Sequence, residues 1–160
     1  MNKFKLIAAA VAITGCVGFC KVKQDKVLDF ARNHTPFYGN CRKVAGAEAE
    51  KLGIKAWEQQ DAFIHAFTSA ELAYKTTPKI AEYLGVLNET ARLKNPTKDK
   101  LMDLYNNKKG IEIGKMLKKR GISLDHLPQI IKDSLDKGSF IVDSTKVKIN
   151  SMTRLLGKNL

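Results

Sequence analysis

The chain has 160 residues, which suits one domain that buries an ordinary hydrophobic core without metals or dense disulfides. Its 28 basic and 16 acidic side chains give a formal net charge of +12, and residues 94–160 alone hold 15 of the basic and 7 of the acidic ones. This basic C-terminal half lacks the interleaved aromatic side chains typical of nucleic-acid binding. The composition therefore argues against a nucleic-acid partner and favours an anionic membrane surface.

The first 15 residues have the pattern of a signal peptide. Lys3 and Lys5 precede a short apolar run, and the uncharged stretch is shorter than the roughly 20 residues that a membrane-spanning helix needs. The run ends in Ile13-Thr14-Gly15-Cys16, which resembles the bacterial lipobox, in which the cysteine is lipidated and becomes the first residue of the mature chain. We expect export to the cell envelope with a lipid anchor on Cys16. The alternative is cleavage nearby, for example after Gly18 with loss of Cys16, which would give a periplasmic or secreted protein.

Two cysteines remain if Cys16 is lipidated. Cys20 and Cys41 could form a disulfide that closes a loop of about 20 residues, worth roughly 3 kcal/mol in the chain-entropy treatment. Two unpaired thiols are the alternative. The cysteine spacing matches no zinc or redox motif, so we assign no metal-thiolate site and no dedicated metal ligand. The identity of any cofactor is left open.

Residues 21–160 are expected to form a single, compact, all-α domain of the helical-bundle type. Apolar side chains recur at helical spacing, and Pro, Gly and Asn mark the breaks between helices. The expected helices are residues 22–32, 45–52, 56–74, 77–91, 97–119 and 127–137, with a loop over residues 33–40. Residues 139–160 fit either a strand or a helix. The motifs described next lie in residues 56–120, the motif-bearing core of this domain.

The helix expected over residues 97–119 has two opposed polar faces. At 100° per residue, its lysine and glutamate side chains gather on one side, whereas the other side collects Asp103, Asn106, Asn107, Gly110 and Gly114. Each glycine costs a helix about 1 kcal/mol relative to alanine, which is reasonable if another backbone or a ligand approaches closely. We therefore expect this face to pack inward, either as a functional pocket or as a structural polar network.

The helix expected over residues 56–74 offers a partner for that face. Asp61 and His65 are one turn apart, so the carboxylate can meet the imidazole and raise its basicity. An ordinary solvated helix face is the alternative. Ser69 follows one turn later, but a triad of Asp61, His65 and Ser69 is disfavoured because successive turns of one helix rarely align the three groups.

Three blocks of sequence resemble an uncharacterised bacterial family of helical domains. They are Gln60 to Ala66, with the pattern Asp-Ala-Phe-x-His, then Asn88-Glu89, and then Met102 to Gly114, with the pattern Asp-x-x-Asn-Asn-x-x-Gly. The resemblance covers about residues 56–116 and implies convergence of six side chains on one site: Asp61, His65, Glu89, Asp103, Asn106 and Asn107. On helical periodicity alone, Glu89 would face solvent.

The chain departs from the family pattern at three places. Ile64, and either Ile111 or Glu112, stand where the family has arginine, and Asn88 stands where it has histidine. If the family's site is catalytic, these departures imply an altered or impaired site in this chain.

Our leading hypothesis is an envelope hydrolase with His65 as general base and Asp61 as the group that orients it. Glu89, Asp103, Asn106 and Asn107 would bind an unidentified envelope substrate, and the group around Asp103 could hold a divalent ion instead. The alternative is a non-enzymatic lipoprotein, such as an immunity or exclusion protein, that binds a protein partner. A sealed polar cluster, or a separation above about 10 Å between His65 and Asp103, would favour the binding protein.

Overall fold

The computed structural model describes residues 21–91, 97–149 and 151–152, with side chains described from residue 36 onward. Within these ranges five α-helices follow one another: α2 (Lys21–Lys51), α3 (Trp57–Lys75), α4 (Pro78–Ala91), α5 (Thr97–Arg120) and α6 (Leu127–Asp136). Two short 3₁₀ turns, η1 (Leu124–His126) and η2 (Ser144–Lys146), flank α6. Since these residues contain no strand, the predicted all-α class is confirmed. None of the helices in the described ranges has both the length and the apolar character needed to cross a bilayer.

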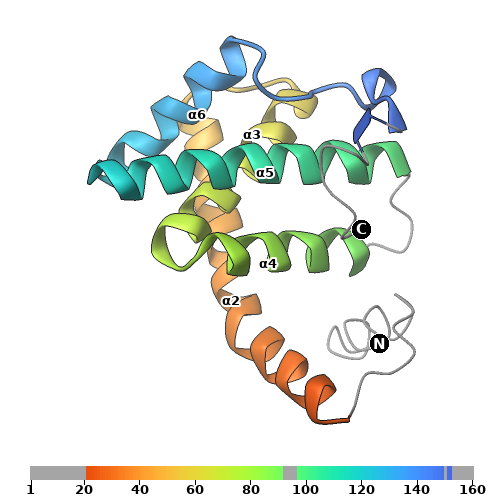
Figure 1. Cartoon of the computed structure of the whole chain (residues 1–160). Helices are drawn as coiled ribbons and strands as arrows, with labels where there is room; N and C mark the ends of the chain where they lie inside the picture. Colours follow the sequence, from red (N-terminus) through yellow and green to blue (C-terminus); the bar gives the residue numbers. More distant parts are fainter. Residues whose placement is uncertain (1–20, 92–96, 150, 153–160) are drawn as a thin grey trace.

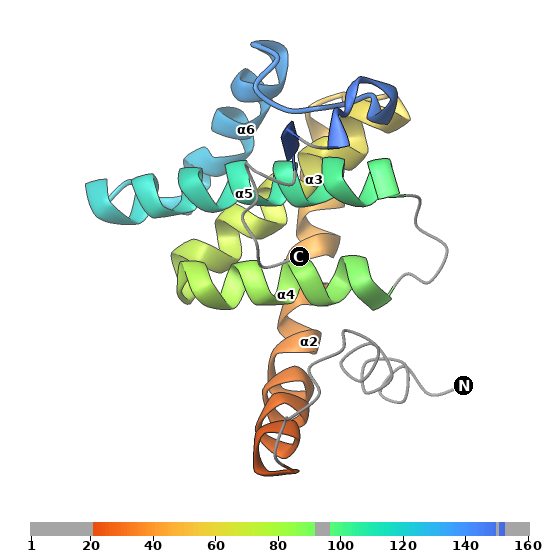
Figure 2. The ribbon, with the colours of Figure 1, turned by 45° about the vertical axis from the view of Figure 1, so that its right-hand side comes forward.

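Helix α3 is the centre of the arrangement, because it packs against α2, α4, α5 and α6. Its most extensive contact is with α5. In both views of the ribbon, α5 lies between α4 and α6, and the N-terminal end of α2 extends away from the other helices (Figures 1 and 2). The two helices that carry the predicted site motifs, α3 and α5, are therefore each other's main packing partners.

The helix ends follow from local sequence. The Thr77 hydroxyl accepts a hydrogen bond from the Ile80 backbone N–H at 3.3 Å, which caps α4 ahead of Pro78 as predicted. Gly53, Gly121 and Gly138 follow α2, α5 and α6 with φ of 69°, 65° and 72°. This left-handed backbone is costly for residues that have a Cβ, so the three glycines end their helices at the predicted places.

The first described helix, α2, differs from the prediction. Residues 33–40 were expected to form a loop, but α2 runs through them without interruption and includes Pro36. The buried side chains of Tyr38, Cys41, Ala45 and Ala49 follow one another at helical spacing on the face that packs inward. Packing of this continuous stripe outweighs the local preference of proline and glycine for a loop.

The main hydrophobic core lies between α3, α6 and the ends of α2 and α5. Phe63 and Phe67 stack with their ring centroids 5.7 Å apart. Leu117 of α5 and Ile131 of α6 are fully buried against the same cluster. This core covers one side of α3, so the opposite side, which carries His65, is left to face α4 and α5.

Glycines set the distance between α3 and α5. A Cβ atom placed on Gly110 would lie 2.0 Å from the Ala66 carbonyl oxygen, and one placed on Gly114 would lie 2.2 Å from the Ala70 carbonyl oxygen. Only a residue without a side chain fits at either position. The predicted inward face with close backbone approach is therefore confirmed, and it brings the polar side chains of α5 directly against α3.

Candidate functional site

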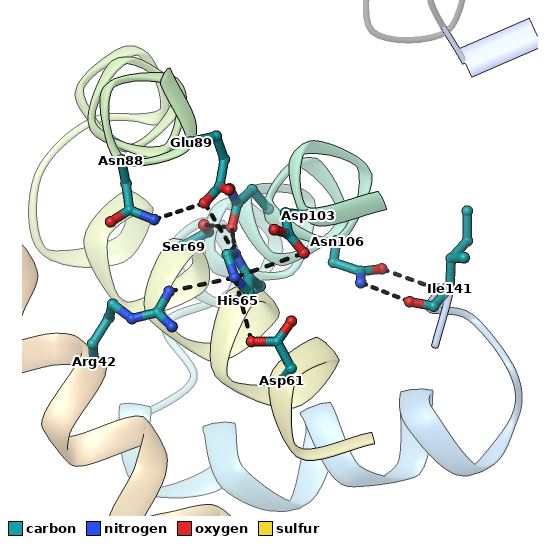
Figure 3. Close-up of polar contacts among 10 residues, drawn as sticks. Arg42, Asp61, His65, Ser69, Asn88, Glu89, Asp103, Asn106 and Ile141 are labelled. Atoms are coloured by element: carbon teal, nitrogen blue, oxygen red, sulfur yellow. Dashed lines mark hydrogen bonds and ion pairs between the residues drawn. The ribbon is translucent and has the colours of Figure 1, made fainter. Parts of the chain in front are cut away.

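His65 lies at the centre of a buried polar cluster formed by α3, α4 and α5 (Figure 3). Its side chain is fully buried, as are those of Thr68 and Ser69 on the same face of α3. The alternative of a solvated helix face is therefore wrong, because α4 and α5 cover this face. His65 Nε2 is only 3.8 Å from Asp103 Oδ1, so the separation that would have favoured a pure binding protein does not occur.

The Nδ1 edge of the imidazole faces an amide and a carboxylate. Nδ1 lies 3.0 Å from Asn107 Oδ1, which also accepts a hydrogen bond from the Ser69 hydroxyl at 3.0 Å. Glu89 Oε1 lies 3.8 Å from the same Nδ1. The Asn107 oxygen, an acceptor, lies at hydrogen-bonding distance from Nδ1, and the Arg42 guanidinium, a donor, faces Nε2, so we assign the Nδ1–H tautomer, with Nε2 as the acceptor of the neutral ring.

The Nε2 edge faces two further carboxylates and one guanidinium. Asp61 Oδ1 lies 3.7 Å away, Asp103 Oδ1 lies 3.8 Å away, and Arg42 Nη1 lies 3.4 Å away. The predicted meeting of Asp61 with His65 is present, but on the Nε2 edge (Figure 3). Asn107, rather than Asp61, is therefore the group that orients the ring through Nδ1.

Glu89 is buried, although helical periodicity placed it in solvent. Only 1 % of the residue is exposed, because α4 packs on both sides in this part of the fold. Asn88, which stands where the resembled family has histidine, donates a hydrogen bond from Nδ2 to Glu89 Oε1 at 2.6 Å. The convergence that the resemblance implied is thus present for Glu89.

Asn106 belongs to a different contact. Its amide Nδ2 donates to the Ile141 carbonyl oxygen at 2.8 Å, and the Ile141 backbone N–H donates to Asn106 Oδ1 at 3.0 Å. This pair of bonds ties the segment after α6 to α5, and the amide points away from His65 (Figure 3). Residues 139–143 form neither strand nor helix, and within them the Asn106 side chain satisfies both backbone groups of Ile141.

An open cavity of about 710 Å³ gives access to the cluster. Asp61 and Asp103 lie in its wall, together with the start of α3, the start of α5 and residues 142–144. Three more carboxylates line it, those of Glu58, Asp99 and Asp143, and the lining residues within the described part of the chain include no lysine or arginine. Trp57 stands at the cavity with 71 % of its surface exposed. The cavity is therefore strongly acidic in a chain that is basic overall.

Two side chains of this wall and the buried His65 beside them have the donor types of a metal site. Asp61, His65 and Asp103 each offer one ligand atom, and these atoms all lie within 4.8 Å of one another. Imidazole nitrogen and carboxylate oxygen are ordinary ligands of divalent cations. The arrangement can thus bind water, a cation or a polar substrate group at the Nε2 edge.

Sequence reasoning missed two parts of this site. Arg42 reaches the imidazole from α2, which the sequence divides with a predicted loop, and no local pattern connects it to α3. The acidic wall contains Asp143, which lies far along the chain from Asp61 and meets it only through the tertiary fold. The sequence does place acidic side chains near the starts of α3 and α5. Without the fold, however, nothing indicates that these two helix starts border the same cavity.

The cysteine predictions are only partly within the described residues. Cys41 is a buried free thiol in the described structure, and burial together with the adjacent Glu71 carboxylate raises its pKa to about 12. Cys20, its expected disulfide partner, and Cys16, the expected lipidation site, both lie outside the described residues. The disulfide and the lipid anchor stay predictions.

Comparisons with known proteins add a family but no activity. No curated protein and no solved structure matched the chain. One family, described as "Domain of unknown function (DUF6973)", matches residues 37–139. That range includes α3, α4, α5 and α6 completely, and with them Arg42, His65, Glu89 and Asp103. Because the match covers well over half of the sequence, the chain belongs to this uncharacterised domain family.

Proposed function

We propose that this chain is an exported cell-envelope hydrolase whose catalytic centre is His65 with Asp61 and Asp103. One observation carries the proposal: the two carboxylates at the Nε2 edge of a fully buried imidazole also line an open cavity of about 710 Å³. Ligand pockets have volumes of this order. A polar network that served stability alone would need no opening, whereas a catalytic centre needs both burial and access.

The chemistry follows from the two edges of the ring. Asn107 fixes the ring through Nδ1, and Nε2 faces the cavity wall between the two carboxylates. We expect a water molecule at this edge to lose a proton to Nε2 while its oxygen bonds to an electrophilic carbon or phosphorus of the substrate. Asp61 and Asp103 stabilise the imidazolium, which then gives the proton to the leaving group as its bond breaks.

The location belongs to the same proposal. The lipobox-like sequence that ends at Cys16 supports a lipid anchor, and the basic C-terminal half supports contact with anionic lipid. Mass spectrometry of the mature N-terminus tests this part. A chain that begins at an acylated Cys16 is expected, and a chain that begins beyond it without acylation would contradict the anchor.

Hydrolysis is tested on the purified full chain with a panel of model acyl esters, amides, glycosides and phosphodiesters and with isolated envelope material. One class is expected to be hydrolysed, with a loss of about 100-fold or more in the His65→Gln and Asp103→Asn variants. His126→Gln is the matched control, since His126 is exposed and is not among the cavity-lining residues. Well-folded protein that hydrolyses nothing, or activity that the two site variants leave intact, would refute the proposal and favour the envelope binding protein.

A further inference from the structure

We propose that Asp61, His65 and Asp103 bind a single divalent transition-metal cation of the Zn²⁺ or Mn²⁺ kind. The use of this cation to activate water rests on the proposed hydrolytic function, whereas the binding of the cation does not. The binding site itself stands on four features of the structure: ligand separation, orientation of the imidazole, local charge and access.

The ligand atoms are close to the separation that one cation requires. Zinc binds nitrogen and oxygen ligands at about 2.0–2.2 Å, which places neighbouring ligands of a tetrahedral site roughly 3.4 Å apart. Nε2 lies 3.7 Å from Asp61 Oδ1 and 3.8 Å from Asp103 Oδ1. All three ligand atoms lie within 4.8 Å of one another, so rotations of the two aspartate side chains would bring them to the spacing of one cation. Three protein ligands leave one position for water or substrate, as in catalytic zinc sites.

The hydrogen bonding of the His65 imidazole is the same as that of typical metal-binding histidines. Such a histidine usually directs one ring nitrogen at the metal and donates the other N–H to a carbonyl or carboxylate, which fixes the tautomer and raises ligand basicity. Here the Asn107 carbonyl oxygen lies 3.0 Å from Nδ1, with Glu89 Oε1 at 3.8 Å. Ser69 fixes the Asn107 amide in turn. The ring therefore presents Nε2 to both aspartates.

The charges around the ring fit a dication. Among the described residues, the carboxylates of Asp61, Glu89 and Asp103 and the guanidinium of Arg42 lie against the imidazole. Three carboxylates around one ring, two of them at the Nε2 edge, attract a cation to that edge.

Arg42 is the competitor for the same edge. Its Nη1 atom lies 3.4 Å from Nε2, at the long limit of a hydrogen bond. A cation on Nε2 would repel this guanidinium, so cation binding requires Arg42 to turn away from the ring. Removal of the arginine charge should therefore strengthen cation binding, whereas removal of either aspartate should weaken it.

The acidic cavity supplies the route. Glu58, Asp99 and Asp143 line the same cavity as the two ligand carboxylates, and none of the lining residues that the structure describes is a lysine or arginine. Carboxylates of one sign in a hollow concentrate cations there. A bound cation would occupy the lone pair of Nε2, so in the metal-loaded chain the cation, rather than His65 as a base, would activate the water.

Calorimetric titration of the full chain, stripped of metals with a chelator, tests the inference with ZnCl₂ and MnCl₂ as probes. One cation per chain is expected, with micromolar or tighter affinity for at least one of the two metals. Asp61→Asn, His65→Gln and Asp103→Asn should each weaken binding by about 100-fold or more, and Arg42→Gln should strengthen it several-fold.

Two variants serve as matched controls. Asp136→Asn removes an exposed carboxylate and His126→Gln removes an exposed histidine, both outside the cavity lining. Neither should change the affinity by more than about threefold. Loss of binding in His126→Gln, or equal weakening in Asp136→Asn and Asp103→Asn, would overturn the inference, because the cation would then sit on the surface.

A measurement on the unmodified chain covers the case in which a site variant fails to fold. In ¹⁵N spectra of the histidine rings, Zn²⁺ should shift Nε2 of His65 and leave Nδ1 protonated. Absence of any change at His65 under saturating Zn²⁺ would overturn the site. Binding without hydrolysis would refute the proposed function and leave the cation site intact, whereas hydrolysis that survives complete chelation would leave the function intact and refute the use of the cation.

Discussion

Replacement of Gly110 by alanine should destabilise the fold, although alanine is the better helix former. The new Cβ would lie 2.0 Å from the Ala66 carbonyl oxygen. That oxygen belongs to a helix backbone in the middle of α3 and cannot rotate away. To reach the ordinary contact distance of 3.4 Å, the two helices must separate locally by about 1.4 Å, which is the difference between the two distances.

The magnitude follows from two opposing terms. Alanine in place of glycine inside a helix stabilises by about 1 kcal/mol. Insertion of an extra carbon into a packed contact costs typically about 1–3 kcal/mol, and the upper end applies here because backbone must move on both sides. We expect a net loss of about 2 kcal/mol for Gly110→Ala and a similar loss for Gly114→Ala, which corresponds to a fall in Tm of roughly 6–10 °C.

Urea denaturation followed by far-UV circular dichroism measures this loss. Gly46→Ala is the matched control, because Gly46 is also inside a helix but a Cβ there would meet nothing within 4 Å. That variant should gain up to about 1 kcal/mol. If Gly110→Ala raised the stability as much as Gly46→Ala does, the close packing of α3 on α5 would be refuted, and with it the distance between His65 and Asn107.

Two further predictions concern residues outside the catalytic centre. Asn106→Ala should cost about 1–3 kcal/mol, because it removes both hydrogen bonds to the Ile141 backbone, and hydrogen exchange at the Ile141 amide should accelerate while exchange within α3 changes little. For Cys41, burial raises the pKa from 9.0 to about 12, so the folded chain keeps its thiol proton at a pH where the unfolded chain loses it. The free energy of unfolding should therefore fall as the pH rises above about 9, by about 1 kcal/mol more at pH 10 than in Cys41→Ala, as measured by parallel urea titrations. A Cys41→Ala variant with the same pH dependence would contradict this assignment.

Sequence reasoning worked where the deciding physics is local. The starts of α4 and α6 and the ends of α5 and α6 depend on a capping threonine, prolines and glycines that act within a few residues. The inward face of α5 was predictable because two glycines four residues apart share a side with Asp103 and Asn107, and glycine is costly in a helix without close packing. Those signals hold whatever the rest of the fold does.

Sequence reasoning failed where long-range packing decides. The loop expected over residues 33–40 is helical, because a buried stripe that runs to Ala49 outweighs the preference of Pro36. Asn106 and Asn107 are neighbours on the same polar face, yet only Asn107 contacts the imidazole, while Asn106 binds the Ile141 backbone. The different contacts of the two amides depend on the position of the segment after α6. The sequence pattern of α5 carries no information about that position.

The stability of Asp103→Asn decides whether the polar cluster exists for the fold or for a ligand. If the carboxylate is one half of a structural ion pair with His65, removal of its charge leaves a buried partner uncompensated and costs about 3–5 kcal/mol. If the cluster is a cation site, Asp61 and Asp103 of the metal-free protein repel each other across less than 4.8 Å, which is worth roughly 3 kcal/mol at an effective dielectric constant of 20. The neutral variant should then be more stable than the metal-free parent, by about 1 kcal/mol after the lost contact to the imidazole is subtracted, and it should no longer gain stability from Zn²⁺. Thermal unfolding of both chains with and without Zn²⁺ separates the two cases, because they predict opposite signs for the same substitution.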